Sequence, residues 1–116
     1  MNNDDILSHM TSLGWRVETL TGNDNLKYNV IRGYSITSGS LTGKRCDIAF
    51  EIVSTIPYVF PNKFHTRPAM LPMDWDKFRT RVSDIGPEWQ YWSRRLDKQP
   101  TPKEIVTHIA TIFKSV

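Results

Sequence analysis

Four prolines within sixteen residues constrain the fold of this chain more than any other feature. Pro57, Pro61, Pro68 and Pro72 lack a backbone N–H and fix φ, and the residue before each of them avoids the helical region. No long regular element can therefore run through residues 57–72. We expect an irregular or briefly extended segment here, which divides the chain into two more regular parts.

The residues before this segment predict a helix over residues 4–13. Its apolar side chains have the i, i+1, i+4 and i+7 spacing that places them on one helical face: Ile6, Leu7, Met10 and Leu13. Asn3, Asp4 or Asp5 is suited to cap the start of this helix, and Gly14 to end it.

Three strands are predicted next. Residues 15–20 and 26–31 flank a turn rich in Gly and Asn, which predicts an antiparallel hairpin. Residues 46–52 predict a third strand, in which apolar side chains alternate with more polar ones: Cys46, Ile48, Phe50 and Ile52. Because this apolar face points into the core, we expect Cys46 to be an inert buried thiol rather than a reactive one.

A short helix and a longer one are predicted after the prolines. Residues 74–84 have Trp75, Phe78 and Val82 at helical spacing, and Pro87 would end this short helix. The sequence Thr-Pro-Lys-Glu at residues 101–104 is a capping box with proline at the first helical position, followed by an apolar stripe: Ile105, Val106, Ile109, Ile112 and Phe113. Together these elements predict a single α+β domain over residues 1–116, an antiparallel meander of three to four strands with helices on one side.

The charge of the chain is unevenly distributed. Residues 63–103 contain nine basic and five acidic side chains, whereas residues 1–62 contain five basic and six acidic ones. A basic half favours an acidic partner, either a protein surface or a nucleic acid. The alternative is a solvated surface of mixed charge.

The sequence shows no signal for a membrane, for export or for a metal. No apolar run approaches the ~20 residues of a membrane-spanning helix, and the acidic start of the chain differs from a basic signal peptide. We therefore expect a cytoplasmic protein that has no membrane contact. The one cysteine and the separated histidines His9, His65 and His108 lack the spacing of metal ligands, so we expect neither a metal nor another cofactor.

The order of the elements, and the residues at their junctions, resemble the ubiquitin-conjugating-enzyme fold. Tyr58-Val-Phe-Pro is a loose version of the tyrosine-proline-phenylalanine-like turn of that fold, and further prolines follow it. The likeness is greater to the prokaryotic ubiquitin-conjugating-enzyme-like proteins of family E, whose landmarks stand here in the same order: Leu13-Gly14, Gly33-Tyr34, Trp89 and Trp92-Ser93-Arg94. The resemblance implies a ubiquitin-conjugating-enzyme-like fold for most of the chain.

Two departures from the family pattern bear on catalysis. Arg95 stands where that pattern has histidine, and arginine does not exchange protons near neutral pH. Thioester transfer also requires a thiolate, which conjugating enzymes place after the proline turn. Residues 57–116 contain no cysteine, so we expect no thioester with a ubiquitin-like protein.

The candidate site residues lie in the second half of the chain. His65 is the one histidine near the expected active centre; it is either a base or oxyanion donor or a purely structural side chain. Trp89, Tyr91 and Trp92 form either an exposed recognition platform or part of the core. Adjacent guanidiniums are too costly to bury unpaired, so we place the partner-binding surface at five residues: Arg94, Arg95, Tyr91, Lys98 and Arg67.

Three functions are compatible with these features. The first, implied by the resemblance and the missing thiol, is a non-catalytic protein that binds a ubiquitin-like protein or an activating-enzyme-like partner in a bacterial conjugation system. The second is an enzyme that uses another residue, such as His65 or Ser93, or that acts only in a complex. The third is a small basic nucleic-acid-binding module, although the chain has no recognised nucleic-acid motif.

Overall fold

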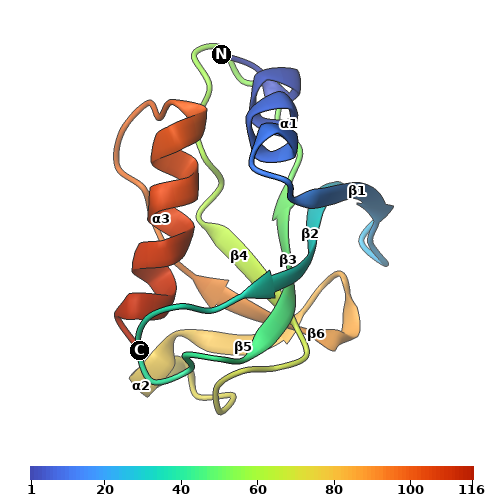
Figure 1. The fold of residues 1–116 in the computed structure, drawn as a ribbon. Helices are drawn as coiled ribbons and strands as arrows, with labels where there is room; N and C mark the ends of the chain where they lie inside the picture. Colours follow the sequence, from blue (N-terminus) through green and yellow to red (C-terminus); the bar gives the residue numbers. More distant parts are fainter.

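The chain forms three helices and six strands (Figure 1). The structure is a computed structural model that describes all 116 residues. In chain order the elements are α1 (Asn3–Ser12), β1 (Arg16–Thr21), β2 (Lys27–Ser35), β3 (Arg45–Glu51), β4 (Lys63–Arg67), α2 (Trp75–Phe78), β5 (Thr80–Ser83), β6 (Gly86–Ser93) and α3 (Pro102–Lys114). The strands form one antiparallel sheet in the order β1-β2-β3-β4-β6-β5, so that β6 lies between β4 and β5. The architecture is α+β, as predicted.

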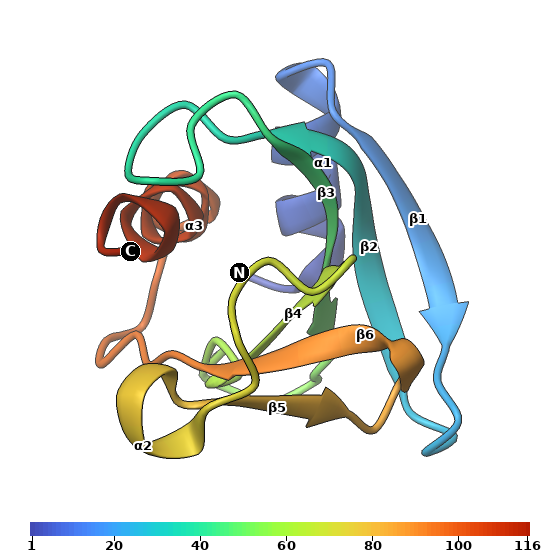
Figure 2. The same cartoon turned by 90° about the horizontal axis from the view of Figure 1, so that it is seen from below.

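One face of the sheet, which we call the helix-covered face, packs against α1 and α3 (Figure 2). Its core combines apolar side chains from both helices with those of the strands, among them Ile6, Met10, Ile48, Phe50, Phe64, Trp92, Ile105, Ile109, Ile112 and Phe113. Phe64, Trp92 and Phe113 pack edge to face, with ring centroids 5.6 or 5.7 Å apart. No helix is long and apolar enough to cross a membrane.

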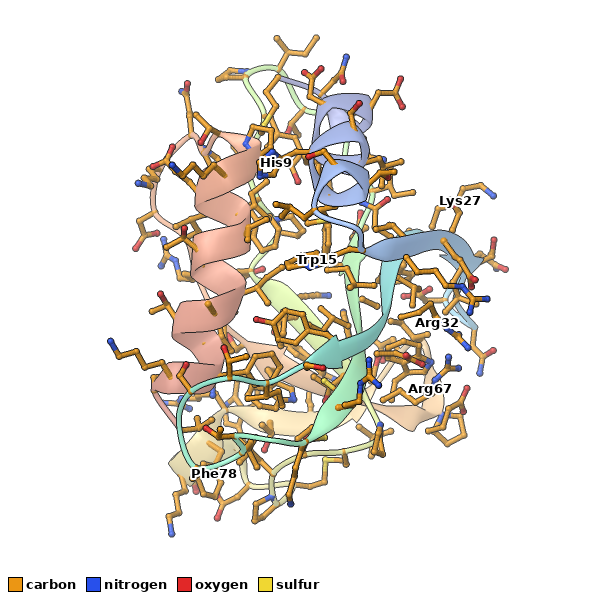
Figure 3. All side chains as sticks on the ribbon, in the orientation of Figure 1. His9, Trp15, Lys27, Arg32, Arg67 and Phe78 are labelled. Atoms are coloured by element: carbon orange, nitrogen blue, oxygen red, sulfur yellow. The ribbon has the colours of Figure 1, made fainter.

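The opposite face of the sheet, the outer face, is covered by neither α1 nor α3 (Figure 2). A smaller apolar cluster lies on it, made of Tyr28, Val30, Ala49, Ile85 and Trp89. The charged side chains of Arg32 and Arg67 lie on the same side, away from α3 (Figure 3). Because successive side chains of a strand alternate between faces, the register of each strand decides which polar residues meet here.

Both long helices begin at a capping box. At α3 the prediction is confirmed: Thr101 accepts from the Glu104 N–H, Glu104 accepts from the Thr101 N–H, and Pro102 begins the helix. At α1 the predicted cap was wrong, because the cap is Asn2 rather than Asn3, Asp4 or Asp5. The Asn2 side chain accepts from the Asp5 N–H and the Asp5 carboxylate accepts from the Asn2 N–H, so only this pair satisfies both donors.

The sheet has six strands, and the prediction of three to four was wrong. The helix predicted over residues 74–84 ends at Phe78, because Arg79 adopts a left-handed backbone conformation (φ 55°) that closes α2. β5 follows at once and pairs with β6. Pro87 does not stop a helix but lies inside β6. It is next to the register shift between β5 and β6 and is paired with no residue of a neighbouring strand, so its missing N–H breaks no sheet hydrogen bond.

Residues 36–44 form a loop between β2 and β3 that closes over the end of α3. The Ser40 N–H donates to the Val116 carbonyl at 2.8 Å. Gly39 has φ +83°, and a Cβ at this position would lie 2.1 Å from the carbonyl oxygen of Phe113. The helix end can approach this loop so closely only because residue 39 has no side chain.

We expect Gly39→Ala to destabilise the protein more than Gly43→Ala does. Gly43 has φ +90° but open space around it, so its replacement carries only the left-handed penalty of about 1 kcal/mol. Gly39→Ala adds a clash with Phe113, which costs about 1–3 kcal/mol more. Urea unfolding of both variants measures the difference, and equal losses would contradict the close approach.

Candidate functional site

Residues 68–74 run from β4 to α2, in the part of the chain where the resemblance to conjugating enzymes implies a cysteine, and none of these residues is cysteine. Gln90 of β6 holds the backbone of this segment. Its Oε1 accepts from the N–H groups of Met70 (2.9 Å) and Leu71 (3.2 Å), and its Nε2 donates to the Leu71 carbonyl (2.7 Å). Since Gln90 is fully buried, these bonds are shielded from competing water.

Thr80 of β5 fixes the end of the same segment. Its hydroxyl donates to the Pro72 carbonyl at 2.6 Å and accepts from the Asp74 N–H at 3.1 Å. Two side chains of neighbouring strands thus satisfy backbone groups that no regular element pairs. We call this arrangement of Gln90 and Thr80 the clamp.

Cys46 lies on β3 and is 4% exposed, in the core of the helix-covered face. Burial, and secondarily the negative charge of Asp47, raise the pKa of its thiol to about 12. The side chain is therefore a protonated thiol at neutral pH and is poorly suited to attack a thioester. The prediction that Cys46 is buried is confirmed.

His65 faces the outer side of β4 and forms a buried pair with Ser83 of β5. The Ser83 Oγ lies 2.9 Å from His65 Nδ1 and also accepts from the Ile85 N–H at 3.0 Å. His65 and Ser83 are 2% and 5% exposed, and the Nε2 of His65 is buried without a partner. The hydroxyl that His65 contacts is thus that of Ser83 and not that of Ser93.

Burial sets the protonation state of this pair. Burial, followed by the positive charge of Lys63, lowers the pKa of His65 to about 4, and the carboxylates of Asp24 and Asp84 only partly oppose the shift. The ring is therefore neutral at physiological pH. Tyr28 and Tyr91 enclose it, with ring centroids 5.4 and 5.6 Å away.

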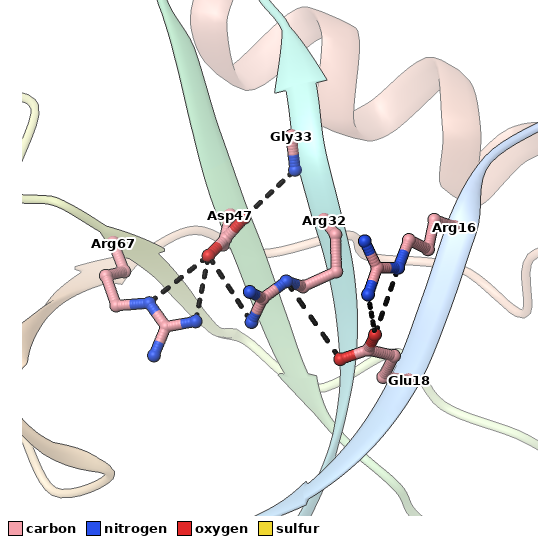
Figure 4. A network of polar contacts seen from close by, with 6 residues as sticks. All are labelled: Arg16, Glu18, Arg32, Gly33, Asp47 and Arg67. Carbon is pink, nitrogen blue, oxygen red and sulfur yellow. Dashed lines mark hydrogen bonds and ion pairs between the residues drawn. The ribbon is translucent and has the colours of Figure 1, made fainter.

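A line of charged side chains crosses the outer face over four strands (Figure 4). Arg67 binds Asp47 through Nε (3.2 Å) and Nη2 (2.9 Å), while the Gly33 N–H donates to the other oxygen of Asp47. Arg32 lies 3.7 Å from Asp47 and 4.0 Å from Glu18. Burial alone would raise the pKa of Asp47, but the Gly33 N–H and the two guanidiniums outweigh it and lower that pKa.

The five predicted partner-binding residues lie in two places. Arg67 and Tyr91 are on the outer face, where Arg67 also covers the ring of Trp89 at 4.5 Å and Tyr91 is 6% exposed. The other three follow β6. Arg94 donates to the carbonyl oxygens of Phe78 and Ser93, Arg95 pairs with Asp97 at 2.9 Å, and Lys98 pairs with Glu104.

Of the three aromatic residues of β6, none forms an exposed platform, since Trp89, Tyr91 and Trp92 are 1%, 6% and 0% exposed. Trp92 donates its Nε1–H to the Thr66 hydroxyl at 3.1 Å. The prediction that at least one tryptophan belongs to the core is confirmed for both. The structure also brings no three His, Cys, Asp or Glu side chains together as a metal site.

A family model described as Prokaryotic E2 family E matches residues 2–116. The chain belongs to this family. Comparison with curated proteins and with solved structures gave no match. Membership confirms the resemblance to ubiquitin-conjugating enzymes over nearly the whole chain. The matched residues include the clamp, the buried His65–Ser83 pair and the line of charged side chains on the outer face.

Three features of this E2-like protein escaped sequence reasoning. Gln90 and Thr80 looked like ordinary polar residues, because their partners are backbone groups of a distant irregular segment. Ser83 belongs to the helix predicted over residues 74–84, and that prediction gave no reason to place it opposite His65 on a neighbouring strand. The position of Asp47 could have been predicted. It directly follows Cys46 in an alternating strand, so its side chain must point to the face opposite the core.

We expect Gln90→Ala to lower the free energy of unfolding by about 2–4 kcal/mol, because it leaves the Met70 and Leu71 amides and the Leu71 carbonyl without their partner. Gln99→Ala, at an exposed position, serves as the control and should stay within about 0.5 kcal/mol of the unchanged protein. Urea unfolding measures both. A Gln90→Ala loss as small as that of the control would show that the clamp does not hold the segment.

The buried His65 predicts a pH dependence of stability. The unfolded chain binds a proton at this histidine near pH 6.5, whereas the folded protein does so only near pH 4. The neutral ring therefore contributes fully to the free energy of unfolding above pH 6.5. This contribution is lost as the pH falls towards 4, at up to ~1.4 kcal/mol per pH unit.

This dependence is measured by urea unfolding between pH 7 and 5, in parallel with the His65→Asn variant, whose amide can still bond to Ser83. The variant should lack the part of the slope that His65 causes. Titration of the His65 ring protons by NMR gives the pKa directly, and a value near 6.5 would contradict its burial.

Proposed function

We propose that this member of Prokaryotic E2 family E is a binding protein that forms no thioester. Its partner is a ubiquitin-like protein or an activating-enzyme-like protein of a bacterial conjugation system. The observation that carries the proposal is the combination of an E2-like chain with no cysteine between residues 57 and 116.

The chemistry of thioester transfer supports the non-catalytic part of this proposal. A thiolate is the nucleophile in that reaction, and it must be accessible to the partner. The single thiol of the chain, on Cys46, is buried in the core and stays protonated. Residues 68–74, which the clamp holds after β4, have only hydrocarbon, thioether and carboxylate side chains, so this segment contains no thiol.

The geometry offers less support for an enzyme with another nucleophile. His65 and Ser83 form the only histidine–hydroxyl pair, and both are buried away from any substrate. The neutral ring at pH 7 suits a base, but no carboxylate hydrogen-bonds to it. The pair therefore resembles a structural contact between β4 and β5 more closely than a catalytic dyad.

The charges after β6 support an acidic partner surface. Arg95 and Lys98 have side chains that are 73% and 54% exposed, and each is paired only with one carboxylate on the surface. Such pairs contribute little to stability, so these cations can exchange their internal partner for one on another protein. We assign the partner contact to this pair, with Arg67 as a further contact on the outer face.

The test is a tagged pull-down from the native host, with eluates run on denaturing gels with and without reductant. We expect capture of a ubiquitin-like or activating-enzyme-like protein, no reductant-sensitive adduct, and unchanged capture by Cys46→Ala. Arg95→Glu with Lys98→Glu should reduce capture at least about tenfold, or ~1.4 kcal/mol. The exposed pair Lys27→Glu with Lys114→Glu makes the same charge change elsewhere and should have little effect.

Two results would overturn the proposal. An adduct that disappears with reductant and in Cys46→Ala would show that this thiol is catalytic. Eluates that contain no protein of either partner class would remove the binding function.

A further inference from the structure

A hollow of about 540 Å³ lies where β1 begins and β2 ends, and it takes no part in the clamp or in the proposed partner contact. Three of its lining side chains are arginines, Arg16, Arg32 and Arg45, and none is acidic. Tyr34, Ser35, Thr37 and Trp15 also line it. A concave site with several cations and no carboxylate favours an anionic group.

The positive charge of this hollow is only partly neutralised from outside it. Arg16 pairs with Glu18 at 2.9 Å. Arg32 has only long contacts, because Asp47 is already bound closely by Arg67 and by the Gly33 N–H. Arg45 is exposed and has no carboxylate within ion-pair distance.

The wall beside Arg45 is an open strand edge. β1 pairs with β2 only as far as Arg32, whereas β2 continues to Ser35 and pairs there with β3 alone. The backbone from Gly33 to Ser35 thus has no strand on its other side. Gly33 itself lies in a register shift, has φ +61° and donates its N–H to Asp47. The regular open edge is therefore at Ser35, because the next residue, Ile36, bonds towards the β3 side. Gly33 adds room, since even a Cβ built on it would lie 4.0 Å from the guanidinium of Arg45.

We propose that this hollow binds the C-terminal end of an extended peptide. The free α-carboxylate pairs with Arg45 and Arg16, and the residue before it bonds to the open edge of β2 at Ser35. Strand addition supplies backbone hydrogen bonds, and capture of a terminal carboxylate supplies direction and specificity. Trp15 and Tyr34, whose rings pack edge to face at 5.5 Å, offer an apolar surface to the side chains of the peptide.

Both features of the site are needed for this assignment. A single phosphate ion would occupy a small part of about 540 Å³, and a nucleotide would leave the open edge of β2 without a partner. A peptide with a free carboxylate uses the cations and the edge together. Neither Arg95 nor Lys98 of the proposed partner contact lines the hollow. Arg67, the further contact, is linked to it only through Asp47, which also pairs with Arg32.

The test is an NMR titration of the isotope-labelled protein with an N-acetylated pentapeptide of alanine, valine and glycine that ends in a free carboxylate. We expect saturating shifts at the amides of Gly33, Ser35 and Arg45. The same peptide with an amidated C-terminus should bind at least about tenfold more weakly. Arg45→Gln should weaken binding of the free acid to the same extent. The neighbouring exposed Lys44, which does not line the hollow, provides the control Lys44→Gln, which should bind within about twofold of the unchanged protein.

Equal binding of the acid and the amide, shifts confined to other strands, or equal affinities of Arg45→Gln and Lys44→Gln would each overturn the proposal. Inorganic phosphate and adenosine monophosphate form the other arms of the titration. If either saturates the same amides at a lower concentration than the peptide, the hollow is a phosphate site and the peptide assignment is wrong. Because the probe contains no folded partner, failure here leaves the result of the pull-down unaffected.

Discussion

The contact among Phe64, Trp92 and Phe113 determines how the rest of the molecule is arranged. These rings come from β4, β6 and α3, so they join a strand inside the proline-rich segment to a later strand and to the last helix. Loss of one such buried ring typically costs 3–5 kcal/mol, a large fraction of the 5–15 kcal/mol that stabilises a domain. The contact also fixes register. With Phe64 and Trp92 turned towards α3, their neighbours His65 and Tyr91 must face the outer side.

Much of the first half and the last helix could be predicted from the sequence, because their signals are local. The capping box at Thr101 needs only four consecutive residues, and the alternation from Cys46 onwards needs one strand. β6 was missed because aromatic side chains occupy both of its faces, with Trp89 and Tyr91 outward and Trp92 inward, which hides the period of two. The inward Gln90 hides it further, since its place in the core makes sense only once the backbone of Met70 and Leu71 is known to lie against it.

The electrostatic pattern of the surface also depends on tertiary contacts. By composition, the basic excess lies in residues 63–103, yet Arg67, Arg95 and Lys98 of that half each meet a carboxylate. Arg45, in the half whose formal charge is negative, has no carboxylate within ion-pair distance. A count of charges along the chain therefore does not predict which cations are paired, because strand register decides which carboxylate each guanidinium reaches.

The clamp has a consequence for recognition. Irregular segments are usually the most mobile parts of a domain, and a ligand that binds one must first restrict its motion. Residues 68–74 differ from such segments, because side chains of β5 and β6 hydrogen-bond to their backbone. Met73 and the following Trp75 nevertheless remain 47% and 43% exposed. The sheet therefore fixes the position of a segment that is accessible to a partner. For a protein that docks on this surface, we expect a smaller loss of affinity to loop ordering than an irregular segment without such contacts would cause.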